Sequence, residues 1–413
     1  MDKIEGTLSN VIKSLIEARN VLQGECRAEL MTRLHDSETL PERKLYELSG
    51  QATQLLHEVQ LLLEPRPMIL ANYFLGSAKT KCLNAAVELH IPDLLKAGPM
   101  DLATLATASK GRPDRLKQVM QVLCSDSVFD FDRESQRYSL NECSQLLLTD
   151  HWTRWWHWVD LYGNEFYDMA RGIPAACREG EMRMPSQIAF DTDLSMFSWF
   201  AAQGSLHRVH RTLGGGATAQ APGIVQDYPW GEIADGKTIV VDVGGGGGGL
   251  IAALLRAVPN LQGGIFDLPE VIDHANKNFH TAYGIYRDVG SRVALEDLHK
   301  GDFFLSIPSY EVYMMKWCLH DWNDYQVVQI LSNIRKAIIL GTKSRLVLLE
   351  IMLRDGYAGN LSRLADLSVF MAASGVERDE GEWRNLARKS GWKIQHIYHL
   401  RNAWPAAMEL VPV

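Results

Sequence analysis

The chain has 413 residues and a formal net charge of −8. This length exceeds what one ordinary hydrophobic core organises, so we expect two domains. An acidic balance argues against a nucleic-acid partner, because phosphate binding needs a basic surface. The N-terminal sequence "MDKIEGTLSN" lacks the apolar core of a secretory signal, and no apolar run is long enough to span a membrane. Six scattered cysteines without a C-x-x-C pair predict reduced thiols in a cytoplasmic protein without a zinc site.

The first 150 residues predict helices and then a winged-helix unit. Apolar residues recur at helical spacing over 4–23 and 45–64, where the second run stops at "PRP". These helices could pack on their own domain or on a partner subunit. From Asp101 the pattern reads helix, turn, helix and a hairpin with strands at 128–131 and 138–140.

A winged helix raises the alternative of a DNA-binding transcription factor. The second helix carries Asp114 and Gln118 rather than a basic stripe, so we interpret the unit as packing or dimerisation scaffold. The apolar helical faces before residue 150 predict a homodimer.

The segment that follows is rich in large aromatic side chains. These residues suit a buried helix face or the wall of an apolar ligand pocket: Trp152, Trp155, Trp156, Trp158, Tyr162, Phe166 and Tyr167. The sequence "MFSWFAAQGSLHRVHRTL" predicts a continuing helix, and "GGGATAQAPG" at 214–223 predicts a flexible linker at the border of the second domain.

Beyond Lys237, strands and helices alternate, which predicts a doubly wound parallel sheet. The expected strands are 238–243, 261–268, 293–299, 312–319 and 344–353, and the helices between them are 249–258, 270–279 and 324–338. Residues 381–400 add a helix and a strand, and 404–413 could close the edge of the sheet. We therefore expect three parts: a dimerisation domain at 1–150, connecting helices at 151–236 and a catalytic domain at 237–413.

The stretch "VVDVGGGGGG" at 240–249 ends the first strand of this sheet in consecutive glycines. Ligands bind outside the carboxyl ends of such strands, where glycine allows a tight turn and close approach to the backbone. Asp267 and Asp302 follow the ends of the next two strands. A loop for an amino-acid group, an acid for a ribose and a later acid for an adenine amine favour S-adenosylmethionine over a dinucleotide.

Six motifs, in order and spacing, resemble those of the plant and fungal class I O-methyltransferases, and most of all the fungal secondary-metabolite branch. They are "VVDVGGGGGG", "FDLPEVI", "GDFF", "YMMKWCLHDWND", "LLEIML" and "GVERDEGEWRNLARKSGW". The resemblance covers nearly the whole chain. It implies a Rossmann-like doubly wound α/β sheet with an N-terminal α-helical, winged-helix dimerisation domain. It also implies cofactor-binding roles for Gly244 and Gly246 in the loop, Asp267 at the ribose, Asp302 and Phe303 at the adenine, and Lys316 beside the cofactor.

Methyl transfer to oxygen needs an acceptor held in line with the methyl group and a base to remove the acceptor proton. His320 follows the fourth strand, and a neutral histidine suits the task of base. Glu350 and Glu377 could orient the imidazole and stabilise its charged form. The family's base and two flanking glutamates match these three residues. No metal is expected, because the acids are spread over separate strands without a histidine pair.

The chain departs from the family at "FAAQGS", where relatives usually have a methionine after the alanine, and in the long 214–223 segment. Both departures concern substrate placement. We therefore expect an O-methyltransferase acting on a phenol or enol of an aromatic or polyketide-derived metabolite. The alternative is a pericyclase or cyclase of the same fold in fungal polyketide or pyridone alkaloid biosynthesis, with no net methyl transfer.

Overall fold

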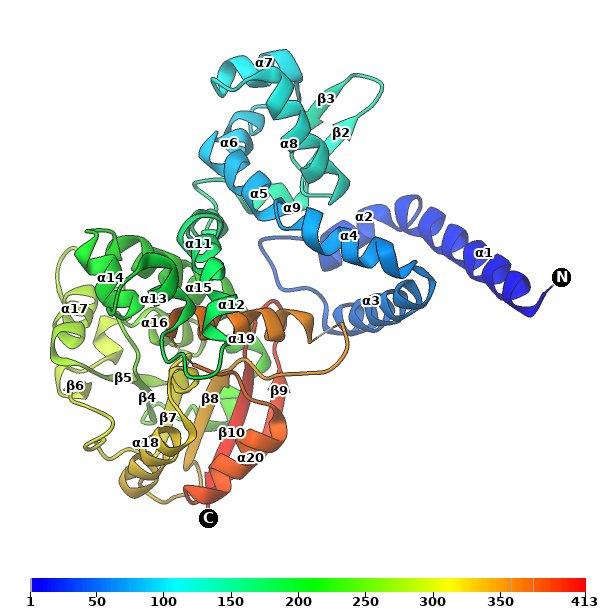
Figure 1. Cartoon of the computed structure of the whole chain (residues 1–413). Helices are drawn as coiled ribbons and strands as arrows, with labels where there is room; N and C mark the ends of the chain where they lie inside the picture. The colour runs from blue at the N-terminus through cyan, green and yellow to red at the C-terminus, as the bar shows by residue number, and fades with distance from the viewer. Residues whose placement is uncertain (1, 358, 374) are drawn as a thin grey trace.

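The computed structural model describes residues 2–413 apart from 358 and 374, and it begins with four helices that stand away from the sheet (Figure 1). They are α1 (Lys3–Gln23), α2 (Arg27–Leu34), α3 (Arg43–Leu63) and α4 (Arg66–Gly76). The helices predicted at 4–23 and 45–64 are thus present as α1 and α3. The "PRP" sequence ends α3 but also starts α4, because a proline in the first helical turn loses no hydrogen bond.

A compact unit follows, drawn in cyan in Figure 1 and separated from the sheet. Its helices are α5 (Lys79–Glu88), α6 (Ile91–Leu95), α7 (Leu102–Ala108), α8 (Pro113–Ser125) and α9 (Glu142–Gln145). The strands β1 (Met100–Asp101), β2 (Asp130–Asp132) and β3 (Arg137–Ser139) form a sheet in the order β1-β3-β2. Leu105, Met120 and Phe129 centre its core. The predicted helix–turn–helix and hairpin are present, with strand limits shifted by one or two residues.

The connecting segment consists of short helices and one long helix. These are α10 (Trp155–Leu161), the π-helical turn η1 (Tyr162–Phe166), α11 (Tyr167–Met169), η2 (Ala170–Gly172), α12 (Ile173–Ala176), α13 (Pro185–Phe190), α14 (Met196–Ala202) and α15 (Leu206–Asp227). The helix predicted across 196–213 is interrupted, because Gly204 adopts a left-handed φ of +68° between α14 and α15.

The prediction of a flexible linker at 214–223 is wrong, because this segment forms the middle of α15. Its glycines allow close packing. A Cβ at Gly215 would lie 2.9 Å from the Cβ of Arg154, and one at Gly216 would lie 2.5 Å from a ring carbon of Trp158. The absent side chains therefore let α15 approach α10, and this tertiary packing overrides the low helix propensity of glycine.

The remaining chain forms a seven-stranded sheet in the order β6-β5-β4-β7-β8-β10-β9. Its strands are β4 (Ile239–Val243), β5 (Gln262–Asp267), β6 (Leu298–Lys300), β7 (Val312–Lys316), β8 (Arg345–Glu350), β9 (Trp392–His399) and β10 (Ala406–Pro412). All pairs from β6 to β8 are parallel, and β10 is antiparallel to both neighbours.

Two sequence expectations for this sheet need correction. The third strand, expected at 293–299, is shortened to the three residues of β6, because residues 295–297 form a 3-10 turn. In that turn the buried Asp297 accepts a 2.6 Å hydrogen bond from the Tyr310 hydroxyl. The C-terminal strand does not close the edge: β10 inserts between β8 and β9, so β9 is the edge strand.

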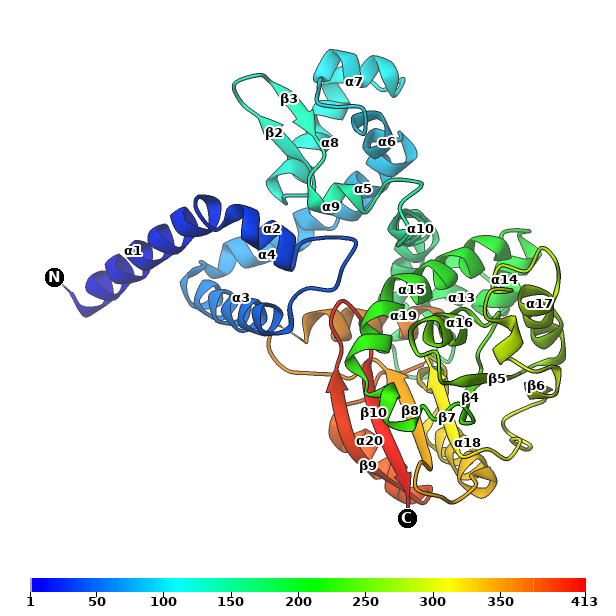
Figure 2. The ribbon, with the colours of Figure 1, turned by 180° about the vertical axis from the view of Figure 1, so that it is seen from behind.

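Helices cover both faces of the sheet (Figure 2). On one face, α15, α16 (Gly249–Ala257) and α17 (Pro269–His280) share a core with alternate side chains of the strands. On the other face lie α18 (Asp324–Ala337) and α20 (Glu380–Lys389). Helix α19 (Asn360–Ala373) packs with the aromatic residues of η1 and α14. The carboxyl ends of β4, β5, β7 and β8 therefore meet at one edge beneath the connecting helices. Among the described residues, no helix combines the length and apolar character needed to cross a membrane.

Candidate functional site

The glycine run forms a loop at the carboxyl end of β4. Gly244, Gly246 and Gly248 have φ values of +74°, +57° and +87°, which side-chain-bearing residues rarely adopt. A Cβ at Gly248 would strike the ring of Phe279, whereas one at Gly246 would meet nothing within 4 Å. Gly248 is thus required by packing, and Gly246 faces open space with bare backbone. This loop fits a ligand that approaches the main chain closely.

Asp267 lies beside this loop at the carboxyl end of β5. Its Oδ2 accepts a 2.9 Å hydrogen bond from the Gly246 amide, and its Oδ1 accepts one of 2.7 Å from the Leu268 amide. Burial raises the pKa of Asp267, although these two hydrogen bonds oppose the shift. The carboxylate is thereby fixed next to the open face of Gly246, where it can accept hydrogen bonds from a ribose diol.

Asp302 and Phe303 reach the same edge from the segment after β6. The Gly301 amide donates a 3.0 Å hydrogen bond to the Asp267 carbonyl, which brings the two acidic segments together. Asp302 Oδ1 accepts a 2.8 Å hydrogen bond from the Phe304 amide, and the Phe303 ring meets Trp322 edge-on at a centroid distance of 6.0 Å. The six residues expected at the cofactor therefore surround the ends of β4, β5 and β7.

A buried acid that the sequence analysis did not assign lies under the glycine loop. Asp242, on β4, is 3% exposed, and burial raises its pKa to about 7. Lys316 ends the adjacent strand β7, and burial lowers its pKa to about 8, although Asp242 opposes this shift. The two groups stabilise each other's charged form at the base of the site. The acid in "VVDVGG" was visible, but its electrostatic interaction with Lys316 depends on the pairing of β4 with β7, in which Asp242 lies opposite Met314.

His320 and two buried glutamates form the second part of the site. His320 lies in the short turn η6 (Leu319–Asp321) after β7. Its Nδ1 is 3.0 Å from Glu377 Oε1 and 3.3 Å from Glu350 Oε2, distances of ion pairs that are not aligned as hydrogen bonds. Both glutamates are completely buried. The structure thus brings together the three residues that the sequence analysis assigned to catalysis.

The charges of the three groups are interdependent. Burial by itself would lower the pKa of His320, but Glu350 and Glu377 raise it well above its ordinary value. Burial raises the pKa of Glu377 to about 7, although His320 opposes this shift. A positively charged imidazole therefore compensates two carboxylates that have no access to water.

Backbone contacts hold this cluster in place. Glu350 Oε1 accepts hydrogen bonds of 2.9 and 2.8 Å from the amides of Cys318 and Leu319, which fixes the turn that carries His320. The Val376 amide donates a 2.9 Å hydrogen bond to the His320 carbonyl. The buried Arg378, which the sequence did not single out, donates a 2.7 Å hydrogen bond to the Trp322 carbonyl. The hydrogen bonds of Val376 and Arg378 tie the segment before α20 to the turn that carries His320.

The reason for expecting no metal does not hold as stated. The acids come from separate segments, yet ligand atoms of His320, Glu350 and Glu377 lie within 4.8 Å of one another. One histidine and two carboxylates could hold a cation at this separation. A protonated His320 also supplies positive charge to the two carboxylates, without a metal. A chelator distinguishes a bound cation from the imidazolium alone.

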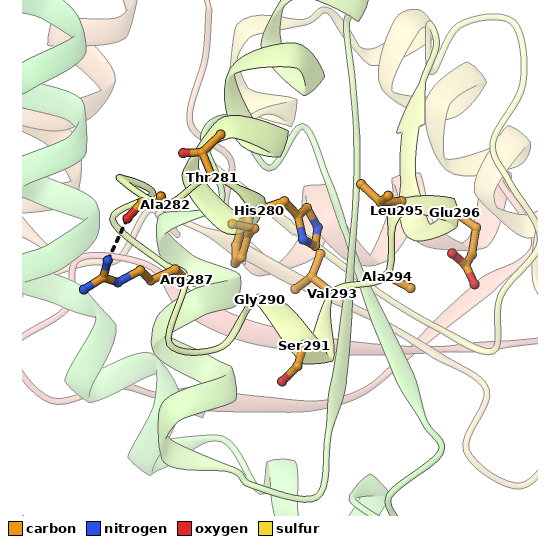
Figure 3. A pocket seen from close by; sticks show the side chains of 11 residues that line it. His280, Thr281, Ala282, Arg287, Gly290, Ser291, Val293, Ala294, Leu295 and Glu296 are labelled. Carbon is orange, nitrogen blue, oxygen red and sulfur yellow. Dashed lines mark hydrogen bonds between the residues drawn. The ribbon is translucent and has the colours of Figure 1, made fainter.

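A hollow of the surface lies elsewhere. It is an open depression of about 600 Å³ lined by the loop between α17 and β6, including His280, Arg287 and Glu296 (Figure 3). Arg287 turns to the Ala282 carbonyl at 2.6 Å, and none of the residues expected at the cofactor or at the histidine lines this depression. We therefore place the functional site at the strand ends and not here.

Two family models match parts of the chain. Residues 234–393 match the family model of the O-methyltransferase domain, and residues 71–150 match that of the O-methyltransferase dimerisation domain. The chain is 51% identical to O-methyltransferase aclM of Aspergillus oryzae, covering 99% of this chain and 95% of that protein. It is 45% identical to O-methyltransferase verK of Clonostachys rogersoniana, over 99% and 100% of the two chains.

The chain is a fungal class I O-methyltransferase. Its fold matches that of CalO1, a methyltransferase of calicheamicin biosynthesis solved with S-adenosylhomocysteine bound, with a TM-score of 0.73. That match covers 85% of this chain and 100% of CalO1 at 22% identity. The methyltransferase uses S-adenosylmethionine, and it is an enzyme of secondary metabolism.

Proposed function

We propose that the methyltransferase transfers a methyl group to a phenol or enol hydroxyl of an aromatic or polyketide-derived metabolite, with His320 as the general base. The observation that carries this proposal is the position of His320 Nδ1 between the buried carboxylates of Glu350 and Glu377. Both acids approach Nδ1, so we assign Nε2, which lies 3.7 Å from Asp321 Oδ1, as the ring nitrogen that receives the acceptor proton. A carboxylate pair behind a histidine is the arrangement that orients and charges a catalytic base.

The raised pKa of His320 matches this task. A phenol titrates near pH 10, so a base whose pKa is raised toward that value removes its proton more readily. When bound, S-adenosylmethionine supplies a methyl group already activated on a positively charged sulfur. With the acceptor hydroxyl held in line with that methyl group, His320 would remove the hydroxyl proton, and Glu350 and Glu377 would stabilise the imidazolium that results.

The cofactor-binding roles belong to the same proposal. Gly246 leaves room for the amino-acid end, and Gly244, which packs against Cys318, starts the same loop. Asp267 accepts from the ribose hydroxyls, and Asp302 with Phe303 holds the adenine. Lys316 lies beside the cofactor, and Asp242 beneath the loop keeps this lysine charged. The open left-handed backbone at Gly246 and the adjacent Asp267 carboxylate support this placement.

The quaternary arrangement is also proposed. Helices α1, α3 and α4 contain no buried residue, and their exposed apolar side chains adjoin the segment that matches the family's dimerisation domain. A homodimer would cover these faces in the way that exposed apolar patches require.

The experiment that tests methyl transfer uses the purified protein, S-adenosylmethionine with a labelled methyl group and a panel of phenols and enols. We expect labelled product and S-adenosylhomocysteine in equal amounts, unchanged by a metal chelator. A substrate that is consumed while no S-adenosylhomocysteine forms would instead establish the pericyclase alternative. Activity lost to the chelator and restored by a divalent metal would assign the glutamates to a cation.

A further inference from the structure

Glu377 differs from Glu350 in how its side chain is held. Glu350 Oε1 accepts hydrogen bonds from the amides of Cys318 and Leu319, which fix this carboxylate beside His320. In the part of the chain that the structure describes, neither carboxylate oxygen of Glu377 accepts a hydrogen bond. Its 3.0 Å contact with His320 Nδ1 is an ion pair without the alignment of a hydrogen bond. The position of the Glu377 carboxylate therefore depends on how the backbone of this residue is held.

The backbone amide of Glu377 is bound by a side chain of α19. Asp366 Oδ1 accepts a 2.8 Å hydrogen bond from this amide. Glu377 is completely buried, and a buried backbone N–H needs a partner. A carboxylate is a stronger partner than a neutral carbonyl, because its charge strengthens the hydrogen bond. Asp366 has no role of its own in the mechanism proposed for His320.

The residues on either side of Glu377 are attached to other parts of the site. The Val376 amide donates a 2.9 Å hydrogen bond to the His320 carbonyl, and the Arg378 carbonyl accepts one of 3.0 Å from the Leu353 amide. These two hydrogen bonds fix the chain before and after Glu377. The hydrogen bond to α19 fixes the residue that carries the carboxylate.

Helix α19 is itself fixed at both ends, so Asp366 stands on a rigid support. Near its start, Arg363 donates a 2.6 Å hydrogen bond to the Arg354 carbonyl. Near its end, Met371 is buried in a core that includes residues of α10, η1 and α11. The hydrogen bond of Asp366 therefore locates Glu377 relative to the helix.

A carboxylate at this place has an electrostatic cost. Burial raises the pKa of Glu377 to about 7, and the negative charges of Glu350 and Asp366 contribute to the rise. Asparagine would accept the same hydrogen bond without this charge, whereas glutamate would keep the charge and displace the acceptor. Substitution can thus separate the position of Asp366 from its charge.

We propose that Asp366 is a positioning residue for methyl transfer, which holds the backbone of Glu377 so that its carboxylate lies against His320. This inference rests on the proposed function and adds to it a residue that acts through Glu377. Without the hydrogen bond, the distance between the Glu377 carboxylate and Nδ1 is no longer fixed. The imidazolium that forms during transfer then loses part of its stabilisation, while binding of the acceptor and of S-adenosylmethionine does not depend on this hydrogen bond.

The first test measures methyl transfer by wild type and Asp366→Ala with the acceptor found in the panel. We expect kcat to fall by about tenfold in the variant, because the base loses a positioned partner. KM for the acceptor and for S-adenosylmethionine should stay within about twofold of the wild type, as for an interaction made only during transfer. An unchanged kcat, with or without higher KM values, would overturn the proposal.

Two conservative variants separate the hydrogen bond from the charge, and they decide the matter if Asp366→Ala does not fold. Asp366→Asn keeps an oxygen acceptor for the Glu377 amide, so kcat should stay within about twofold of the wild type. Asp366→Glu keeps the charge but displaces the acceptor by one methylene, so kcat should fall by about fivefold. A lower rate in Asp366→Asn together with a normal rate in Asp366→Glu would refute the positioning role.

A double variant tests whether Asp366 acts through Glu377. Glu377→Leu removes the carboxylate and lowers kcat by itself. Adding Asp366→Ala to Glu377→Leu should change kcat by less than about twofold, because no carboxylate is left to position. A further fall of about tenfold would show that Asp366 acts by another route, contrary to the proposal.

Amide hydrogen exchange, measured by mass spectrometry over residues 375–378, reports the hold on Glu377 without any turnover. The Glu377 amide should exchange at least about tenfold faster in Asp366→Ala, because it loses a hydrogen bond to a charged group. The Val376 amide, which donates to the His320 carbonyl, is the internal reference. Unchanged exchange at Glu377 in a folded Asp366→Ala protein would contradict the assignment.

The matched control is Asp101→Ala. Asp101 Oδ1 accepts a 2.9 Å hydrogen bond from the Thr104 amide at the start of α7, in the unit that stands apart from the sheet (Figure 1). This variant also loses a carboxylate bound to a backbone amide, and it should leave kcat and the exchange of the Glu377 amide unchanged. An equal fall of kcat in Asp101→Ala and Asp366→Ala would mean a general loss of stability and would overturn the positioning role.

The same proteins distinguish this inference from the proposed function. A wild type that forms no S-adenosylhomocysteine from any acceptor, while Asp366→Ala speeds exchange at Glu377, would overturn methyl transfer and support the hold of Asp366 on Glu377. Methyl transfer by the wild type, with kcat and exchange both unchanged in Asp366→Ala, would overturn this inference alone.

Discussion

His320 combines a buried ring with two carboxylates at its Nδ1, and this sets the pH dependence of the reaction. Because its pKa is raised, the ring stays protonated to a higher pH than an ordinary histidine, and the neutral base forms only above that value. We expect kcat/KM to rise with pH along a limb that lies well above pH 6.5.

Glu377→Gln should move this limb to lower pH, because it removes one of the charges that stabilise the imidazolium. The same shift governs stability. The contribution of the charged ring to folding is complete below the ordinary pKa and is lost as pH rises through the raised one. Rate profiles of wild type and Glu377→Gln that coincide would argue against this coupling.

The glycines of the cofactor loop differ in role: Gly248 is required by packing, whereas Gly246 is open to a ligand. Substitutions can separate these two roles. Gly246→Val should lower the affinity for S-adenosylhomocysteine by about tenfold or more and leave the fold intact, because only open space surrounds this position. The matched control is Gly236→Val at a distant open turn with φ of +83°, where similar strain should leave the affinity unchanged. Calorimetry on both variants measures this. Equal affinities of Gly246→Val and Gly236→Val for S-adenosylhomocysteine would contradict the assignment of this loop to the cofactor.

At the scale of elements, α15 shows what glycines in a helix can do. Gly216→Ala should destabilise the protein by ~1–3 kcal/mol, because the new methyl group overlaps Trp158. Gly214→Ala, in the same run but exposed and without neighbours within 4 Å, should stabilise it by ~0.5–1 kcal/mol. Denaturant unfolding of both variants measures the difference. The same sign for both would mean that α15 does not pack on α10 through these glycines.

Local patterns predicted most elements because strands and helices of the catalytic region alternate regularly. The buried run of β4, the acid of β5 and the periodic face of α18 each have a clear signature. The failures arose where tertiary contacts outweigh local preference. The glycines of α15 have low helix propensity but fit against α10, and β10 inserts between β8 and β9 by a return path that no local pattern encodes.

The site was predicted to a similar extent. Motifs identified His320, Glu350 and Glu377, but only the fold shows that both acids approach the same nitrogen. Sequence reasoning missed Asp242, because an acid within a strand has no distinctive spacing. Its burial depends on contacts between elements far apart in the chain.

At the scale of the whole molecule, the N-terminal helices leave large apolar side chains in water. Leu62 on α3 is 79% exposed and Tyr73 on α4 is 80% exposed. We expect a dimer by light scattering at micromolar concentration, and Leu62→Glu with Tyr73→Glu should shift it toward monomer. The control Leu340→Glu, at a position 67% exposed in the catalytic region, should remain dimeric. A wild type of monomeric mass would contradict the proposed assembly.

We propose that His320 removes the acceptor proton during methyl transfer, and the rate of a single turnover is the most direct test of this role. Wild type and His320→Ala are saturated with labelled S-adenosylmethionine, mixed with the acceptor found in the panel and sampled over time. We expect the variant to have the cofactor affinity of the wild type and a melting temperature close to it, with methyl transfer slower by roughly 10²- to 10⁴-fold. Transfer at an unchanged rate in a folded, cofactor-bound His320→Ala protein would contradict it.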